Sequence, residues 1–193
     1  MRNNRKLIYL SLLSALGIVL GLFESVIPLP VAIPGARLGL SNIVVLVTIV
    51  AIGYKEGFFV SIFKTVILAL VTGAVSSFFF SLGGALLSSL AMIIAHKFLR
   101  KYLSLIGISE IGSFFHNLGQ VLVASYIMKT TAILAYLPLL VILGIFTGFF
   151  VGLASIYIVD NTNISKERAW NGKYYFGIKF SKKERNFIAF YRF

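Results

Sequence analysis

The sequence predicts an all-α fold, a polytopic membrane protein built as a bundle of six transmembrane helices. Hydrophobic residues make up 59% of the 193 residues and charged residues only 12%. The mean hydropathy is +0.95. A soluble domain of this size exposes far more charge. We predict a six-helix transmembrane domain over residues 1–159 and a basic, aromatic tail over 160–193, either flexible or associated with the membrane surface.

Six apolar stretches have about the length of a bilayer crossing, roughly 20 residues. They cover 7–27, 37–53, 58–75, 82–99, 109–128 and 137–159. The connection "PLPVAIPGARLG" between the first two holds three of the four prolines, which predicts a stiff loop.

The basic residues give a direction to these helices. Those on one side of the predicted bundle are Arg2, Arg5, Lys6, Lys55, Lys97, Arg100, Lys101 and the basic residues of the tail. The opposite loops hold only Arg37 and Lys129. Because positive residues stay inside, we expect both termini in the cytoplasm.

Small residues recur every four positions in two of the stretches. Gly144, Gly148 and Gly152 form such a row in the last stretch, and this spacing lets helix backbones approach closely within lipid. We expect these glycines to pack helices inside the bundle. Ser11 and Ala15 show the same spacing in the first stretch, where contact with another subunit is a competing interpretation.

The fifth stretch has a polar face. At 100° per residue, Ser113, His116, Asn117 and Gln120 fall within an arc of about 100°. This face must point into the bundle or into a wet cavity. Its side chains either bind a solute or form hydrogen bonds to neighbouring helices.

The third stretch repeats the pattern with Ser61, Lys64, Thr65 and Thr72. A buried ammonium costs at least about 2.5–3.5 kcal/mol unless it is solvated, paired or reaches the interface. Lys64 therefore either enters a hydrophilic pocket or snorkels to the inner surface.

Two further charges lie near the outer surface. Glu24 ends the first stretch and Arg37 begins the second, so they either form a structural ion pair or bind a solute. The chemistry of these groups suits an anionic or carbonyl-bearing solute. The candidate substrate-binding residues are Glu24, Arg37, Asn42, Lys64, His116, Asn117 and Gln120.

Several classes of chemistry have no motif in the chain. Cysteine is absent, which excludes disulfides and thiolate metal sites. No Walker phosphate loop, no Asp-rich magnesium–diphosphate motif and no metal-ligand spacing occurs. We therefore expect no metal, no cofactor and no enzymatic activity. The basic excess reflects topology, so nucleic acid is not an expected partner.

Three segments resemble a known family. They are "FESVIPLPVAIPGARLGLSNIVVLVTI", "SLGGALLSS" and "IGISEIGSFFHNLGQVLVASY". Together they are similar to the Gx transporter family of bacterial membrane proteins, often labelled heptaprenyl diphosphate synthase component I. The likeness covers roughly 7–158, and "PGARLGLSNI" and "HNLGQ" are its most specific parts.

That family is similar in turn to the S components of energy-coupling factor transporters. The resemblance implies a six-helix protein of the bacterial cytoplasmic membrane that captures a micronutrient. It also implies a transmembrane coupling protein and cytoplasmic ATPases as partners, with Ser11 and Ala15 at the contact. The synthase label implies the alternative, a membrane subunit that assists polyprenyl diphosphate synthesis.

Overall fold

The computed structural model describes residues 3–27, 36–161, 174–175 and 178–179. Six α-helices follow one another: α1 (Asn3–Ser25), α2 (Asn42–Ala51), α3 (Tyr54–Thr72), α4 (Val75–Ile94), α5 (Leu105–Ile127) and α6 (Leu137–Asn161). A π-helical turn (Ala95–Leu99) extends α4, and a 3-10 helix (Thr131–Tyr136) precedes α6. The all-α prediction is confirmed, except for two short antiparallel strands, β1 (Tyr174–Tyr175) and β2 (Ile178–Lys179). Most of the tail predicted over 160–193 lies outside the described residues.

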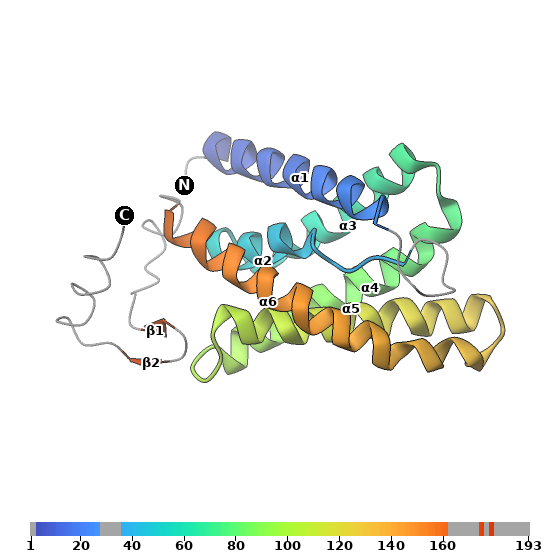
Figure 1. Cartoon of the computed structure of the whole chain (residues 1–193). Coiled ribbons are helices and arrows are strands. Elements are labelled where there is room, and N and C mark those ends of the chain that lie inside the picture. The colour runs from blue at the N-terminus through green and yellow to red at the C-terminus, as the bar shows by residue number, and fades with distance from the viewer. Residues whose placement is uncertain (1–2, 28–35, 162–173, 176–177, 180–193) are drawn as a thin grey trace.

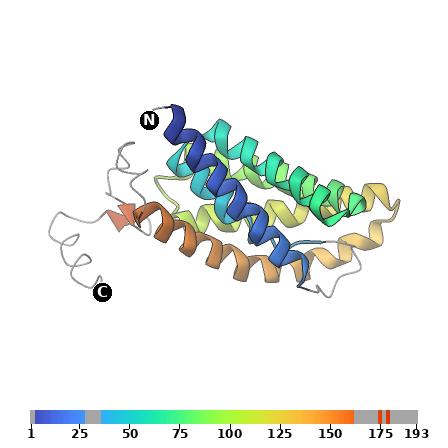
Figure 2. The ribbon, with the colours of Figure 1, turned by 90° about the horizontal axis from the view of Figure 1, so that it is seen from above.

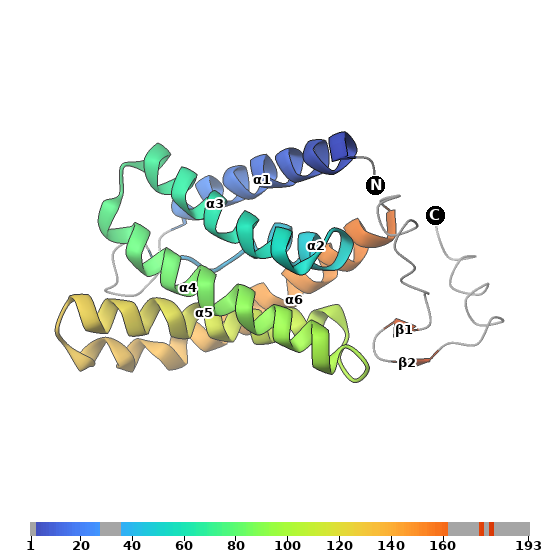
Figure 3. The same cartoon turned by 180° about the vertical axis from the view of Figure 1, so that it is seen from behind.

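The helices lie in a bundle in which successive long helices reverse direction (Figure 1). α1 begins and α6 ends at the same end of the bundle, where α3 and α5 also begin. From behind, α3 and α4 lie side by side and α4 packs on α5 (Figure 3). From above, α1 runs obliquely over α2 and beside α3 (Figure 2).

Three helices are long and apolar enough to cross a membrane: Lys6–Ser25, Ser77–Leu99 and Thr131–Asn161. Large apolar side chains also point outward from the bundle, including Phe59 on α3 and Phe150 on α6. Water does not favour such a surface, whereas lipid does. The protein is therefore membrane-associated.

The prediction of one helix over 37–53 is wrong for its first part. Residues 36–39 have no regular structure, 40–41 form a turn, and α2 begins only at Asn42. Gly39 has φ +88°, a left-handed conformation that interrupts a helix and that glycine adopts without strain. Residues 36–41, called here the inner segment, run among the helices to reach α2 (Figure 1).

The glycine row of α6 lies against α5. A Cβ atom at Gly152 would lie 2.5 Å from the Ile106 Cα atom, and one at Gly148 would lie 3.2 Å from the Glu110 Cα atom. One at Gly144 would lie 2.6 Å from Asn117 Nδ2. The small residues thus allow α5 and α6 to approach more closely than larger side chains would permit.

Candidate functional site: a buried polar cluster around residues 36–41

Backbone without helical hydrogen bonds is tolerated at membrane depth only where protein or water supplies the missing partners. In the inner segment, side chains from distant helices supply them. Three of these side chains are Glu24 of α1, Gln120 of α5 and Thr147 of α6. The segment is therefore held in place by polar groups that the helices direct inward.

Glu24 binds the turn before α2. One of its carboxylate oxygens, Oε1, accepts hydrogen bonds from the backbone N–H groups of Gly39 and, at 3.3 Å, of Leu40. The other oxygen, Oε2, is buried and has no hydrogen-bond partner in the described part of the chain. The carboxylate is thus fixed through one oxygen and retains accepting capacity on the other.

Gln120 pairs with the backbone of Arg37 through both ends of its amide. The Arg37 N–H donates to Oε1 at 2.9 Å, and Nε2 donates to the Arg37 carbonyl at 2.8 Å. The Gln120 side chain is completely buried. The amide therefore satisfies the backbone N–H and C=O groups of Arg37, which in a strand or a helix would bond to neighbouring backbone.

Lys64 points into the bundle and does not snorkel to a surface. Its ammonium group donates to Ser41 Oγ at 2.7 Å and to Asn42 Oδ1 at 3.3 Å, and the side chain is only 4% exposed. The Asn42 amide in turn donates to Ser88 Oγ of α4 at 3.3 Å. Lys64 therefore contacts the first residues of α2 through neutral oxygen acceptors.

His116 lies beside the same turn. A Cβ atom at Gly39 would be 3.2 Å from His116 Cδ2 and 3.0 Å from Asn42 Nδ2, so the absence of a side chain at Gly39 makes room for both groups. The imidazole is 4% exposed. Its Nδ1 faces the backbone of Gly84 on α4, where a Cβ atom would lie 2.9 Å away, whereas its Nε2 is buried and has no hydrogen-bond partner among the described residues. A buried imidazole with a free Nε2 can still bind a ligand.

Arg37 and Glu24 do not form the ion pair that their positions suggested. The structure shows no salt bridge between them, and Glu24 binds backbone instead. The Arg37 side chain is 7% exposed and makes no hydrogen bond to another described residue, although the Glu24 carboxylate lies within range of its charge. Its guanidinium group is therefore a buried cation whose N–H donors remain available for a ligand.

Asn117 lies apart from this cluster, on the face of α5 that packs against α6. Its Nδ2 donates to the Leu140 carbonyl at 2.7 Å, and the neighbouring Ser113 hydroxyl donates to the Gly144 carbonyl at 2.8 Å. These bonds connect two helices, as the alternative interpretation of the polar face anticipated. We call the residues that do gather around the inner segment the polar cluster: Glu24, Arg37, Ser41, Asn42, Lys64, His116 and Gln120.

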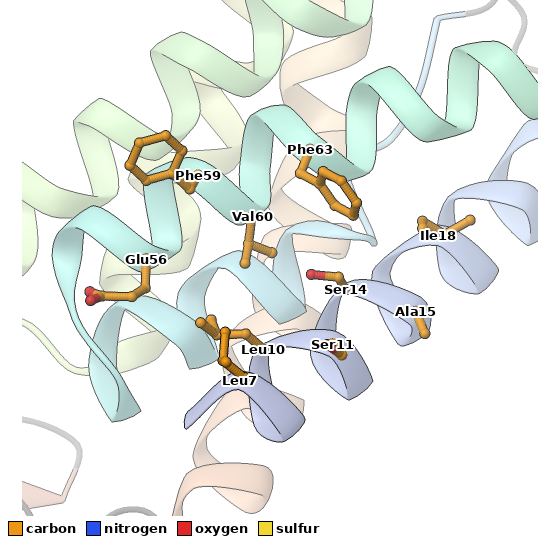
Figure 4. Close-up of a pocket in the computed structure, with 10 residues that line it drawn as sticks. All are labelled: Leu7, Leu10, Ser11, Ser14, Ala15, Ile18, Glu56, Phe59, Val60 and Phe63. Atoms are coloured by element: carbon orange, nitrogen blue, oxygen red, sulfur yellow. The ribbon is translucent and has the colours of Figure 1, made fainter. Parts of the chain in front are cut away.

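Ser11 and Ala15 lie elsewhere, in a groove of about 680 Å³ between α1 and α3 (Figure 4). Both side chains are exposed, and Phe59 and Phe63 of α3 line the opposite side. An ion pair between Lys6 and Glu56 joins the same two helices. Gly17 instead faces the interior, where a Cβ atom would lie 3.4 Å from Lys64 Cδ.

The chain matches the family described as heptaprenyl diphosphate synthase component I over residues 13–158. This range covers more than half of the sequence and contains the whole polar cluster. The chain belongs to the heptaprenyl diphosphate synthase component I family. No curated protein and no solved structure matches it.

Sequence reasoning identified five members of the polar cluster in this family member by their helical faces or charges: Glu24, Arg37, Lys64, His116 and Gln120. It included Asn42 but missed Ser41 and the contributions of Ser88 and Thr147, because single hydroxyl side chains are common in apolar helices. The motif "PGARLG" was the available signal for the inner segment, since a glycine after a proline-rich stretch indicates a break in helical structure.

Proposed function

We propose that this family member is the solute-binding membrane component of an energy-coupled micronutrient uptake transporter. The observation that carries the proposal is the polar cluster. It places a lysine, an arginine and a histidine with a free Nε2 inside a bundle whose outer surface is apolar. Polar and ionisable groups at membrane depth are expensive and commonly mark a solute or ion pathway. The bound solute would lie against the inner segment.

The proposal includes a topology of six crossings in the bacterial cytoplasmic membrane, with both termini in the cytoplasm. Its support is the reversal of successive helices together with the distribution of basic residues. Lys6, Lys55 and Lys97 all lie at the end of the bundle where α1 begins and α6 ends. Lys129 follows α5 at the opposite end. Such an asymmetry is typical of a cytoplasmic face.

Transport against a gradient needs an energy source, and the chain has no nucleotide-binding motif. We therefore include partner subunits, a transmembrane coupling protein and cytoplasmic ATPases. The groove between α1 and α3 is the proposed contact because Ser11 and Ala15 leave space there for a helix of the coupling protein.

A second candidate function is that of a membrane subunit in polyprenyl diphosphate synthesis. The family description favours it, because the words "component I" imply a second component. This function predicts a stable complex with a catalytic subunit and a change in product length or rate on co-expression. It does not require a small molecule bound in the polar cluster.

Native mass spectrometry of the purified full chain separates the two functions. The transporter proposal predicts a co-purified small molecule that is lost from the Lys64→Met variant and retained by Lys97→Met, a control lysine outside the cluster. The protein in proteoliposomes should accumulate that solute only when the coupling protein and ATPases are added. A preparation that carries no small molecule, and whose co-expression with a prenyl synthase changes the products, would favour the second function.

The partner contact has its own test. Ala15→Leu fills the groove, whereas Val19→Phe enlarges an exposed side chain of α1 that does not line it. We expect the first variant to lose co-purification with the coupling protein while it keeps the bound solute, and the second to keep both. Equal co-purification of both variants would place the partner contact elsewhere.

A further inference from the structure

We propose that the solute carries an anionic group, a carboxylate or a phosphate, and that this group binds between Arg37, Lys64 and the first turn of α2. This inference rests on the proposed function and specifies its substrate class. Three observations support it: the balance of buried charge, the position of a helix N-terminus and the free Nε2 of a buried histidine.

The polar cluster contains one more cation than anion. Within the described residues, the buried Lys, Arg, Asp and Glu side chains are Arg37, Lys64 and Glu24. Lys64 and Arg37 are close enough to influence each other electrostatically, and Glu24 lies within range of both. One carboxylate therefore faces two cations, and the cluster has a formal net charge of +1.

Among the residues that the structure describes, no other acidic side chain is placed to neutralise the excess. Glu56 lies in the first turn of α3 and pairs with Lys6, Glu110 faces α6, and Asp160 lies at the end of α6. Residues 28–35, whose structure is not described, contain no charged side chain. A buried charge without a counter-charge is strongly unfavourable. A bound anion would supply the missing negative charge and so stabilise the cluster.

The N-terminus of α2 adds positive potential at the same place. A helix N-terminus carries the equivalent of roughly half a positive charge, and α2 begins beside Lys64 within the bundle. The N-cap residue Ser41 makes no side-chain hydrogen bond to the helix and instead accepts from the lysine. Anions bind readily at such helix ends.

His116 is the second indication of a ligand at this helix end. The Cδ2 edge of its buried ring lies against Gly39, its Nδ1 faces Gly84 on α4, and its Nε2 has no hydrogen-bond partner in the part of the chain that the structure describes. It lies within range of the charges of Lys64 and Arg37. An imidazole N–H could donate to the same anionic group that the two cations attract.

The test uses the full-length protein in nanodiscs of neutral phosphatidylcholine, with acetate and inorganic phosphate as probes. Acetamide, at the same ionic strength, is the neutral counterpart of acetate. A ligand at roughly tenfold its Kd should raise the thermal unfolding midpoint by about 3–6 °C for a chain of this size. We expect such a shift with acetate or phosphate and none with acetamide. The more effective anion distinguishes a carboxylate from a phosphate site.

Variants test whether the anion-induced shift of the unfolding midpoint depends on the polar cluster. Lys64→Met and Arg37→Gln should lose the shift, and Lys97→Met should keep it. Lys64→Arg, which preserves the charge, should retain part of the shift and covers the case in which Lys64→Met does not fold.

Equal shifts in the wild type and the Arg37→Gln variant, or no anion-specific shift in the wild type, would overturn the inference. A co-purified solute that proves neutral or cationic would also overturn it but leave the proposed function intact. The absence of any bound solute counts against the proposed function itself.

Discussion

The amide of Gln120 should be one of the most important single side chains for stability in this protein. The substitution Gln120→Met keeps the volume and removes both hydrogen bonds to the Arg37 backbone. A buried polar group left without a partner costs about 1–3 kcal/mol, so the loss of two partners predicts a decrease in unfolding free energy of about 2–6 kcal/mol. The side chain is completely buried, so bulk solvent does not contact the two groups that would lose their partners.

The measurement is a titration with SDS in mixed micelles, followed by circular dichroism at 222 nm, from which the free energy of unfolding is extrapolated. Asn117→Leu is the matched control on the same helix. Its Nδ2 donates to the Leu140 carbonyl, which lies within α6 and can still accept a helical hydrogen bond. We therefore expect a smaller loss, about 1 kcal/mol. A Gln120→Met variant no less stable than Asn117→Leu would show that this amide does not hold the inner segment.

Three other substitutions test further parts of the structure by the same titration or by native mass spectrometry. Glu24→Gln keeps an acceptor for the turn before α2 but removes the carboxylate charge that faces Arg37 and Lys64, so it should lower the free energy of unfolding by about 3–5 kcal/mol. Glu24→Leu also removes both hydrogen bonds and should lower it further; equal losses in the two variants would contradict the bonding described. Gly152→Leu should destabilise the protein by about 1–3 kcal/mol because the new side chain meets the backbone at Ile106, whereas the exposed Phe150→Leu should be nearly neutral. His116→Leu should release the co-purified solute while the unfolding midpoint stays close to that of the wild type; a solute retained at full occupancy would assign His116 a structural role.

The sequence allowed the helices and their faces to be predicted because both depend on local periodicity. The polar faces of α3 and α5 repeat at helical spacing, and the burial of Lys64, His116 and Gln120 agrees with that pattern. The same reasoning could not separate Asn117 from Gln120, although one contacts α6 and the other the inner segment. Asn117 and Gln120 are three positions apart, so their side chains differ in direction by 300° around the helix axis. The positions of the neighbouring helices decide which partner each side chain contacts.

The inner segment was not predicted because its partners are far away in the sequence. The hydropathy of residues 37–53 is typical of a transmembrane helix, and the glycine at position 39 is only a weak local indication that the helix begins later. What permits a non-helical backbone is a set of acceptors and donors on α1, α5 and α6, as much as 109 residues away. Hydrogen bonds between residues so far apart in the chain produce no periodic pattern in the sequence.

The turn at residues 39–41 leaves α2 a short helix. Its ten residues, at about 1.5 Å each, advance roughly 15 Å, which is about half of a hydrocarbon core of about 30 Å. A search for long apolar helices alone therefore passes over Asn42–Ala51. Because Gly39 adopts a left-handed conformation in the turn that precedes α2, a larger residue at this position would strain the backbone at the point where the helix begins.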